Sequence, residues 1–340
     1  MAITDETKLQ LKELYMADLI QRITGVIDNF PNKSSISSVI LTGSLGRNEA
    51  TFYYDEKTNK ARLISDVEIA LVYRGGYKKD AKVLKEILIG AFDEEINPMT
   101  ISLSRVKNMY NFNYTIVKPK YNSIFMYDLY NGSRTIWGKD LIQEKQEKNL
   151  AKYDKYEAKR IVANRIGELA YIKYVDKVEE RQIKQWEGKL MLALGTAYCI
   201  VKGYYHSHYK KQMEFISSNQ EKDNIYTLLG ENFVDDYVEA YNHLRLGYST
   251  YEVPLERIKY YVERMNTQVF NTNNAYKKSK INSMSRKLKY LVSFIKTKPA
   301  DISITNIERN IIDKLIAQFI HYENCDDMKK LSIAWKRIIY

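Results

Sequence analysis

The sequence predicts an α+β protein: a mixed sheet flanked by helices, followed by an all-helical part. Short β-branched runs bounded by turn residues recur through residues 1–142, whereas apolar residues at helical spacing dominate residues 143–340. The chain of 340 residues is also long for a single core. We therefore expect two domains, 1–142 and 143–340.

The first domain is predicted to begin with a helix that Thr4 or Asp5 caps and that ends at Asn29. A β-branched run over 38–41 then enters a glycine-serine turn. The later elements expected here are strands at 51–54 and 61–72 around a hairpin tip, a helix at 79–95, a strand at 99–104, a helix at 122–130 and a strand at 135–140. The apolar side of the 79–95 helix is expected to contain Val83, Ile87, Leu88 and Phe92.

The second domain is predicted to contain helices alone. Its first apolar face runs from Ala158 to Ile172, after a polar stretch at 143–155. Further helices are expected at 181–202, 231–246, 255–269, 284–295, 307–321 and 328–339. No internal repeat is visible in this pattern.

Composition limits the kinds of protein to consider. The longest apolar stretch, 190–201, is shorter than the roughly 20 residues that cross a bilayer, and the acidic N-terminus does not resemble a secretory signal. With only Cys199 and Cys325, no disulfide or zinc motif is expected. These features predict a cytoplasmic protein without membrane insertion. The net charge of +11 favours an anionic partner.

Two motifs carry the candidate chemistry. Gly43 and Ser44 end the first strand in a turn whose backbone N–H groups can approach phosphate closely. Asp66 and Glu68 stand one residue apart in the next apolar strand, so both side chains are expected on one face. Two neighbouring carboxylates repel each other unless a cation lies between them. The turn and the acid pair together predict phosphoryl chemistry that depends on Mg²⁺ or Mn²⁺.

The order of these motifs resembles the nucleotidyltransferase superfamily of DNA polymerase β-like enzymes, and within it the aminoglycoside nucleotidyltransferases. The matching segments are Thr42-Gly43-Ser44-Leu45-Gly46-Arg47-Asn48-Glu49 and Ser65-Asp66-Val67-Glu68, and residues 127–134 and 136–140 resemble the region that closes such a domain. The resemblance covers roughly the first 140 residues. It implies a nucleotidyltransferase-type sheet in which Gly43 and Ser44 bind a nucleoside triphosphate, while Asp66 and Glu68 ligate magnesium and are catalytic.

Two departures from the family pattern affect this expectation. The spacing from Ser44 to Asp66 is longer than usual, and a hairpin over 53–62 would absorb the excess without moving the site. The family's third acid, aligned by pattern on the next strand, becomes Ser102, whose neutral hydroxyl is a poor metal ligand. Either an acid at 93–95 replaces it, or metal binding and catalysis are weakened or lost.

Three side chains have open roles. Arg47 can contact a phosphate of the bound nucleotide, or it can form a structural salt bridge with Glu49 or Asp66. His206 and His208 stand two residues apart without a nearby acid, a pattern that favours a surface loop over a metal site.

The general base and the acceptor site are also open. Glu68 itself can accept the proton, as can a carboxylate of the helical domain such as Glu157 or Glu168. The stretch 265–300 contains eight Lys and Arg residues and no acid. It can bind nucleic acid or a phosphorylated acceptor, or it can be a solvated helix face.

The leading hypothesis is therefore a metal-dependent nucleotidyltransferase. It would move a nucleoside monophosphate from a nucleoside triphosphate such as ATP, the co-substrate, to an acceptor hydroxyl and release pyrophosphate. An RNA end, a phosphorylated sugar or a protein hydroxyl suits the positive net charge better than a cationic aminoglycoside, and the helical domain is expected to bind the acceptor. The alternative is a nucleotidyltransferase-like module without turnover that binds nucleotide or RNA.

Overall fold

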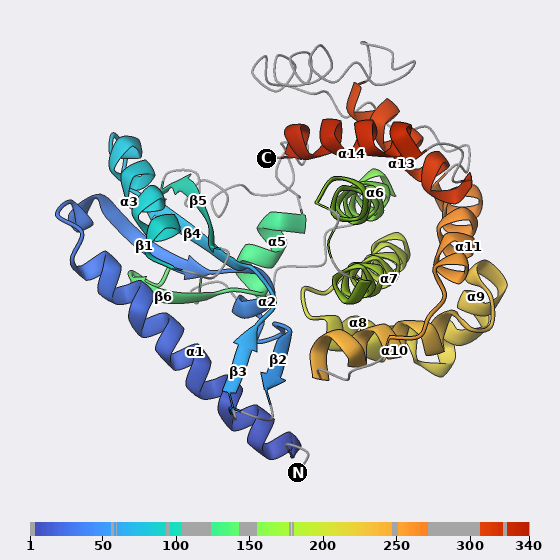
Figure 1. Cartoon of the computed structure of the whole chain (residues 1–340), viewed down its shortest axis with the longest axis horizontal. Helices are drawn as coiled ribbons and strands as arrows, with labels where there is room; N and C mark the ends of the chain where they lie inside the picture. Colours follow the sequence, from blue (N-terminus) through green and yellow to red (C-terminus); the bar gives the residue numbers. More distant parts are fainter. Residues whose placement is uncertain are drawn as a thin grey trace. The chain divides into compact units, whose positions relative to one another are not determined.

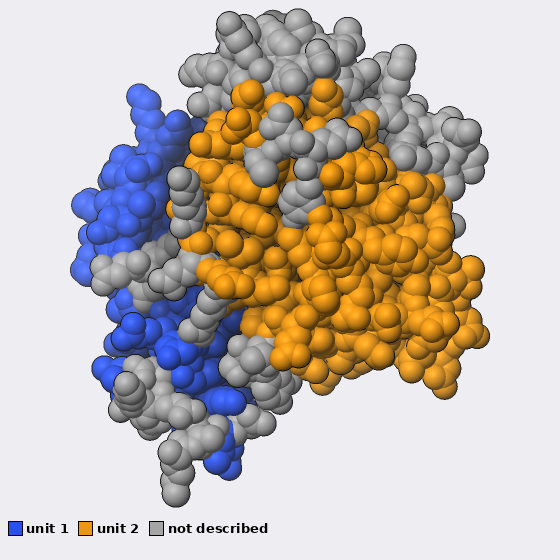
Figure 2. Space-filling view, turned by 45° about the vertical axis from the view of Figure 1, so that its right-hand side comes forward, with its two compact units in different colours: residues 1–151, 245–247 blue, residues 152–244, 248–340 orange. Residues whose placement is uncertain are grey.

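The computed structural model describes residues 4–55, 58, 60–92, 96–103, 124–142, 155–176, 178, 180–246, 251–270, 307–321 and 325–339. The chain divides into two compact units, which Figure 2 colours separately. The first unit comprises residues 1–151 with 245–247, and the second comprises residues 152–244 with 248–340. All described strands lie in the first unit, and the regular structure described in the second is helical. The predicted α+β class with a helical C-terminal part is confirmed.

A four-stranded mixed sheet forms the centre of the first unit (Figure 1). Its strands are β1 (Ile36–Leu41), β4 (Val67–Tyr73), β5 (Ile96–Ser102) and β6 (Arg134–Gly138), in the spatial order β5-β4-β1-β6. β1 pairs antiparallel with both β4 and β6, whereas β4 and β5 run parallel. The predicted strands at 38–41, 99–104 and 135–140 correspond to β1, β5 and β6.

A separate hairpin lies between β1 and β4 in the sequence. It consists of β2 (Phe52–Asp55) and β3 (Lys60–Leu63), which pair from Phe52↔Leu63 to Asp55↔Lys60. This pairing confirms the predicted hairpin, and residues 56, 57 and 59 of its tip lie outside the described residues. The predicted continuous strand over 61–72 is wrong, because the chain leaves the hairpin at Leu63 and enters a different sheet at Val67.

Two helices cover one face of the four-stranded sheet. They are α1 (Asp5–Asp28) and α3 (Lys78–Ala91), and their apolar side chains pack with those of β1 and β4. Thr4 is the N-cap of α1, since its hydroxyl accepts a 3.2 Å hydrogen bond from the backbone N–H of Thr7. The predicted first helix and its cap are therefore confirmed. A short helical turn, η1 (Lys33–Ser35), follows α1 and leads into β1.

The buried side of α3 differs from the predicted one. Ala81, Leu84 and Leu88 are fully buried, whereas Val83 is 52% exposed and Ile87 is 41% exposed. Residues 81, 84 and 88 follow the three- and four-residue spacing of a helix face. Of the four expected apolar residues, Leu88 is buried in the core and Phe92, directly after the helix, packs against it partly buried.

The opposite face of the sheet holds a smaller core. Ile40, Ala70, Val72 and Ile101 pack there with Leu129 of α5 (Ile124–Asn131). Side chains two residues apart on a strand share a face. Glu68 therefore lies on the same face as Ala70, the face that α5 partly covers.

The second unit is built from helices throughout its described part. They are α6 (Lys155–Tyr171), η2 (Ile172–Asp176), α7 (Glu180–Lys202), α8 (Tyr209–Ile216), α9 (Asn219–Leu229), α10 (Phe233–Leu246), α11 (Leu255–Met265), η3 (Asn266–Phe270), α13 (Ile307–His321) and α14 (Cys325–Ile339). Six of the seven predicted helices correspond to members of this set. Helices α8 and α9 were not predicted, and the predicted helix at 284–295 lies outside the described residues.

Glycines allow close packing between these helices. A Cβ added to Gly195 of α7 would lie 2.0 Å from the Tyr237 ring of α10, and one added to Gly167 of α6 would lie 2.5 Å from the Trp335 ring of α14. Both rings therefore contact a helix backbone directly. None of the helices described is both long and apolar enough to cross a membrane.

Candidate functional site

The glycine-serine turn is a tightly hydrogen-bonded segment at the end of β1. Gly43 adopts φ +62°, a conformation in which glycine is favoured, and begins the one-turn helix α2 (Gly43–Gly46). The backbone N–H groups of Gly46 and Arg47 donate to the carbonyls of Thr42 and Gly43, at 3.0 and 3.2 Å. The turn is therefore fixed by its own backbone.

The same turn is joined to the start of β4. The backbone N–H of Thr42 donates to the carbonyl of Glu68 at 2.9 Å, and the Thr42 hydroxyl donates to the same oxygen at 3.3 Å. The Thr42 side chain is buried, so water does not compete with these bonds. This contact places the two sequence motifs side by side.

The Glu68 carboxylate itself lies against Gly43. A Cβ built on Gly43 would lie 1.7 Å from Glu68 Oε2 and 2.7 Å from its carboxyl carbon. Real Cβ atoms do not approach other atoms this closely, so only glycine fits at position 43 in this arrangement. The structure thus brings together Gly43 and Glu68, as the sequence predicted.

The two predicted acids occupy different local positions. Glu68 is the second residue of β4, whereas Asp66 immediately precedes the strand. Both side chains are half-buried. The Ser65 hydroxyl accepts a 3.0 Å hydrogen bond from the Thr51 backbone N–H, which holds the approach to β4 against the segment after the turn.

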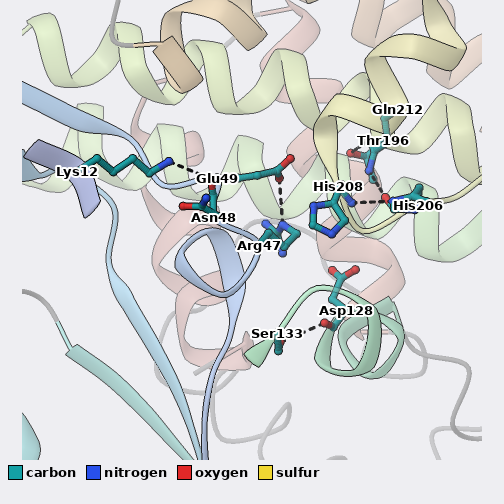
Figure 3. Close-up of polar contacts among 10 residues, drawn as sticks. All are labelled: Lys12, Arg47, Asn48, Glu49, Asp128, Ser133, Thr196, His206, His208 and Gln212. Atoms are coloured by element: carbon teal, nitrogen blue, oxygen red, sulfur yellow. Dashed lines mark hydrogen bonds and ion pairs between the residues drawn. The ribbon is translucent and has the colours of Figure 1, made fainter. Parts of the chain in front are cut away.

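Arg47 makes the structural salt bridge that the sequence left open. Its Nε lies 3.2 Å from Glu49 Oε2, and both side chains are almost buried, with 10% and 5% exposed (Figure 3). Beside this pair, Lys12 of α1 donates to the Asn48 carbonyl at 2.9 Å. Asn48 has φ +57°, so the turn ends in a second left-handed residue. A phosphate contact by Arg47 stays a prediction.

The position predicted for a third acid is wrong. In the parallel ladder, Ser102 lies opposite Tyr73 at the far end of β4, whereas the residue opposite Glu68 is Asn97. Ser102 lies five positions beyond Asn97 along β5, a distance of about 17 Å. Ser102 therefore does not stand at the acid pair. The pattern alignment failed because β5 begins three residues before the predicted strand. The acids at 93–95 lie outside the described residues.

The donor atoms near the turn suit a hard divalent cation. Asp66 and Glu68 supply carboxylate oxygens and Ser44 supplies a hydroxyl, and protein sites for Mg²⁺ commonly use one or two carboxylates together with substrate phosphates. Among the residues that the structure describes, no cluster of three or more His, Cys, Asp and Glu could hold a metal ion. Asp66 and Glu68 alone do not make such a cluster.

A second chain segment reaches the turn from the other side of β1. A Cβ on Gly46 would lie 2.5 Å from the Leu41 carbonyl and 2.8 Å from the Gly132 carbonyl. The Ser133 hydroxyl donates to the Asp128 carbonyl of α5 at 3.2 Å (Figure 3). Arg134 follows as the first residue of β6 and pairs with Leu41. The sequence analysis assigned no role to Arg134, although its place directly after Gly132-Ser133 marks it as an arginine beside a turn.

The other candidate side chains belong to the second unit. Glu157 and Glu168 are in ion pairs on α6, with Arg160 at 2.8 Å and Arg165 at 2.5 Å. Either carboxylate would need to leave its arginine partner to act as a general base.

The two histidines lie in the segment before α8. His206 Nδ1 accepts a 3.0 Å hydrogen bond from the His208 backbone N–H (Figure 3). The Gln212 side chain donates to the His206 carbonyl at 2.6 Å, and the Thr196 hydroxyl contacts Gln212 Oε1 at 2.8 Å. This contact network supports a structural role. Of the basic stretch, residues 271–300 lie outside the described part.

Comparison with known proteins gives no relative: no protein-family model, no curated protein and no solved structure matches this chain.

Proposed function

We propose that the chain is a metal-dependent nucleotidyltransferase whose site lies in residues 1–142, which adopt the nucleotidyltransferase-type sheet. The observation that carries this proposal is the contact between the Glu68 carboxylate and Gly43. A turn suited to phosphate and an acid suited to a cation are adjacent, as transfer from a nucleoside triphosphate requires.

The binding tasks are divided among the residues of the site. Gly43 and Ser44 hold the triphosphate through backbone N–H groups and the serine hydroxyl. Asp66 and Glu68 hold Mg²⁺ or Mn²⁺ through carboxylate oxygens. When bound there, the cation neutralises negative charge on the phosphates. Arg47 braces the turn through Glu49.

The reaction is an in-line displacement at the α-phosphorus. The acceptor hydroxyl oxygen forms a bond to this phosphorus, while the bond to the oxygen bridging the α- and β-phosphorus breaks. Pyrophosphate leaves with the electron pair, and the hydroxyl proton passes to a carboxylate, for which Glu68, Glu157 and Glu168 are the candidates.

The acceptor class follows from charge. A chain with a net charge of +11 attracts anions, so an RNA end or another anionic molecule with a free hydroxyl is favoured over a cationic aminoglycoside. The helical second unit is the proposed acceptor-binding part.

The test is pyrophosphate release by the full-length protein. Each of the four nucleoside triphosphates is incubated with Mg²⁺ or Mn²⁺ and a mixed pool of acceptors. Turnover is expected, and Asp66→Asn should lower it by about 100-fold or more. The matched control is Asp18→Asn, which changes an acid that is 64% exposed on α1 and should leave turnover unchanged.

The outcomes separate the two functions considered. Release that both variants retain equally would contradict the assignment of Asp66. Nucleotide binding without turnover under either metal would contradict the enzyme and favour the nucleotide- or RNA-binding module.

A further inference from the structure

Arg134 is a positively charged residue of the first unit whose guanidinium is partly buried. Its side chain is half-buried at the start of β6, and two of its nitrogens, Nε and Nη2, are buried. Neither nitrogen has a hydrogen-bond partner within the described part of the chain. A guanidinium normally uses its N–H groups in pairs toward carboxylate or phosphate. Neither donor has such a group as a hydrogen-bond partner among the described residues.

Leaving these donors unsatisfied is energetically costly. Buried polar groups in native proteins are almost always hydrogen-bonded, and a buried charge is normally paired. Burial also lowers the pKa of Arg134, whereas a neighbouring carboxylate would raise it. A buried guanidinium with two unsatisfied donors therefore has the chemical character of an anion-binding site.

The neighbours of Arg134 place its strand beside the glycine-serine turn. Arg134 pairs with Leu41, and such antiparallel partners have Cα atoms about 4.5–5.5 Å apart. Leu41 is followed directly by Thr42 and Gly43. Arg134 therefore lies on β6, the neighbour of the strand that leads into the turn. Gly46 of the same turn is in backbone contact with Gly132, two residues before Arg134.

We propose that Arg134 binds a polyphosphate anion beside the Gly43–Gly46 turn. The identification of this anion as the triphosphate of a nucleotide rests on the proposed function. A planar fork of donors suits phosphate oxygens, and its positive charge attracts them.

The test measures binding of sodium tripolyphosphate to the full-length protein by calorimetry. EDTA is present, and sodium chloride of equal ionic strength serves as the reference. Arg134→Gln should weaken binding at least about tenfold, and Arg134→Lys should retain part of it, because a lysine keeps the charge but not the fork. The matched control is Arg62→Gln, which changes an exposed arginine of β3 and should bind as the wild type does.

Stability separates a binding role from a structural one. Since the guanidinium has no partner in the described residues, Arg134→Gln should melt at the wild-type temperature or above it without tripolyphosphate. Tripolyphosphate should raise the melting temperature of the wild type and not of this variant. A large loss of stability in ligand-free Arg134→Gln, or equal tripolyphosphate affinity in both proteins, would overturn the proposal.

Failure of the proposed function gives a different result. Glu68→Gln should abolish nucleotidyl transfer but keep or strengthen metal-free tripolyphosphate binding, because it removes a negative charge. Arg134-dependent binding without any turnover would leave this inference standing and reject the enzyme. Absence of tripolyphosphate binding to the wild type would reject the inference alone.

Discussion

The Glu68 carboxylate occupies the space where any residue larger than glycine at position 43 would place its Cβ, 1.7 Å from Oε2. This relationship links the turn to the acid strand by direct contact. A substitution at Gly43 should therefore lower the free energy of unfolding in two ways: through the left-handed backbone conformation and through steric overlap with Glu68.

We expect Gly43→Ala to abolish activity and to destabilise the protein by more than the about 1–2 kcal/mol that a left-handed conformation costs. The added methyl group must displace the Glu68 side chain. The matched control is Gly76→Ala, since Gly76 has φ +87° but nothing within 4 Å of its Cβ position. Urea unfolding of both variants measures the overlap as the difference between their free energies of unfolding.

A double-mutant cycle identifies the overlapping partner. Glu68→Ala should reduce the cost of Gly43→Ala by about 0.5–3 kcal/mol, because the clashing carboxylate is gone. Equal costs in both backgrounds would show that Glu68 is not the obstacle.

The ladder register gives a prediction for Ser102. We expect Ser102→Asp to leave Mn²⁺ affinity unchanged and Ser102→Ala to leave activity unchanged, since Ser102 lies opposite Tyr73 and about 17 Å along the strand from the residue opposite Glu68. Titration with Mn²⁺, followed by electron paramagnetic resonance, measures the affinity. Tighter Mn²⁺ binding by Ser102→Asp would place this residue at the metal after all.

Removing one charge of the Arg47–Glu49 pair should lower the free energy of unfolding more than removing both charges. Because both side chains are almost buried, Glu49→Gln removes the charge that lies 3.2 Å from Arg47 Nε and is expected to cost about 3 kcal/mol in free energy of unfolding. The double variant Arg47→Met with Glu49→Leu should cost less than the single one, because it removes both charges. Urea unfolding checks both values. A double variant less stable than Glu49→Gln would show that the charge pair is not the main source of this cost.

Local signals made much of the fold predictable. The Thr4 cap is visible in the sequence because capping depends on residues a few positions apart. The contact of Gly43 with Glu68 was expected because each motif ends or begins an apolar strand. The helices α8 and α9 were missed because their 8 and 11 residues provide few turns for a periodic pattern.

Other features depend on contacts between residues far apart in the sequence, which local sequence patterns do not predict. The register that moves Ser102 away from Glu68 is set by which residue of β5 meets Val67. The exposure of Val83 follows from the rotation of α3 on the sheet. Only the structure shows that two buried nitrogens of Arg134 have no hydrogen-bond partner among the described residues.

The last prediction concerns pH and a buried acid of the second unit. The Asp236 side chain is 5% exposed, accepts a 2.5 Å hydrogen bond from the Tyr261 hydroxyl and lies 2.8 Å from Arg257 Nε. Burial raises the pKa of Asp236 above its ordinary value of 3.8, and the nearby carboxylates of Asp235 and Glu239 add to this effect. The Tyr261 hydrogen bond and the Arg257 charge lower the pKa without cancelling the rise.

A raised pKa in the folded state means that the folded protein holds this proton more tightly than the unfolded chain does. As pH rises from the unfolded to the folded pKa, the wild type should lose stability relative to Asp236→Asn, by at most about 1.4 kcal/mol per pH unit. The difference should be constant above that window, where Asp236 is ionised in both states. Urea unfolding of the two proteins from pH 4 upward measures it, and the titration of all other groups cancels in the comparison. A difference that favours the wild type increasingly as pH rises would show that Arg257 and Tyr261 outweigh burial at Asp236.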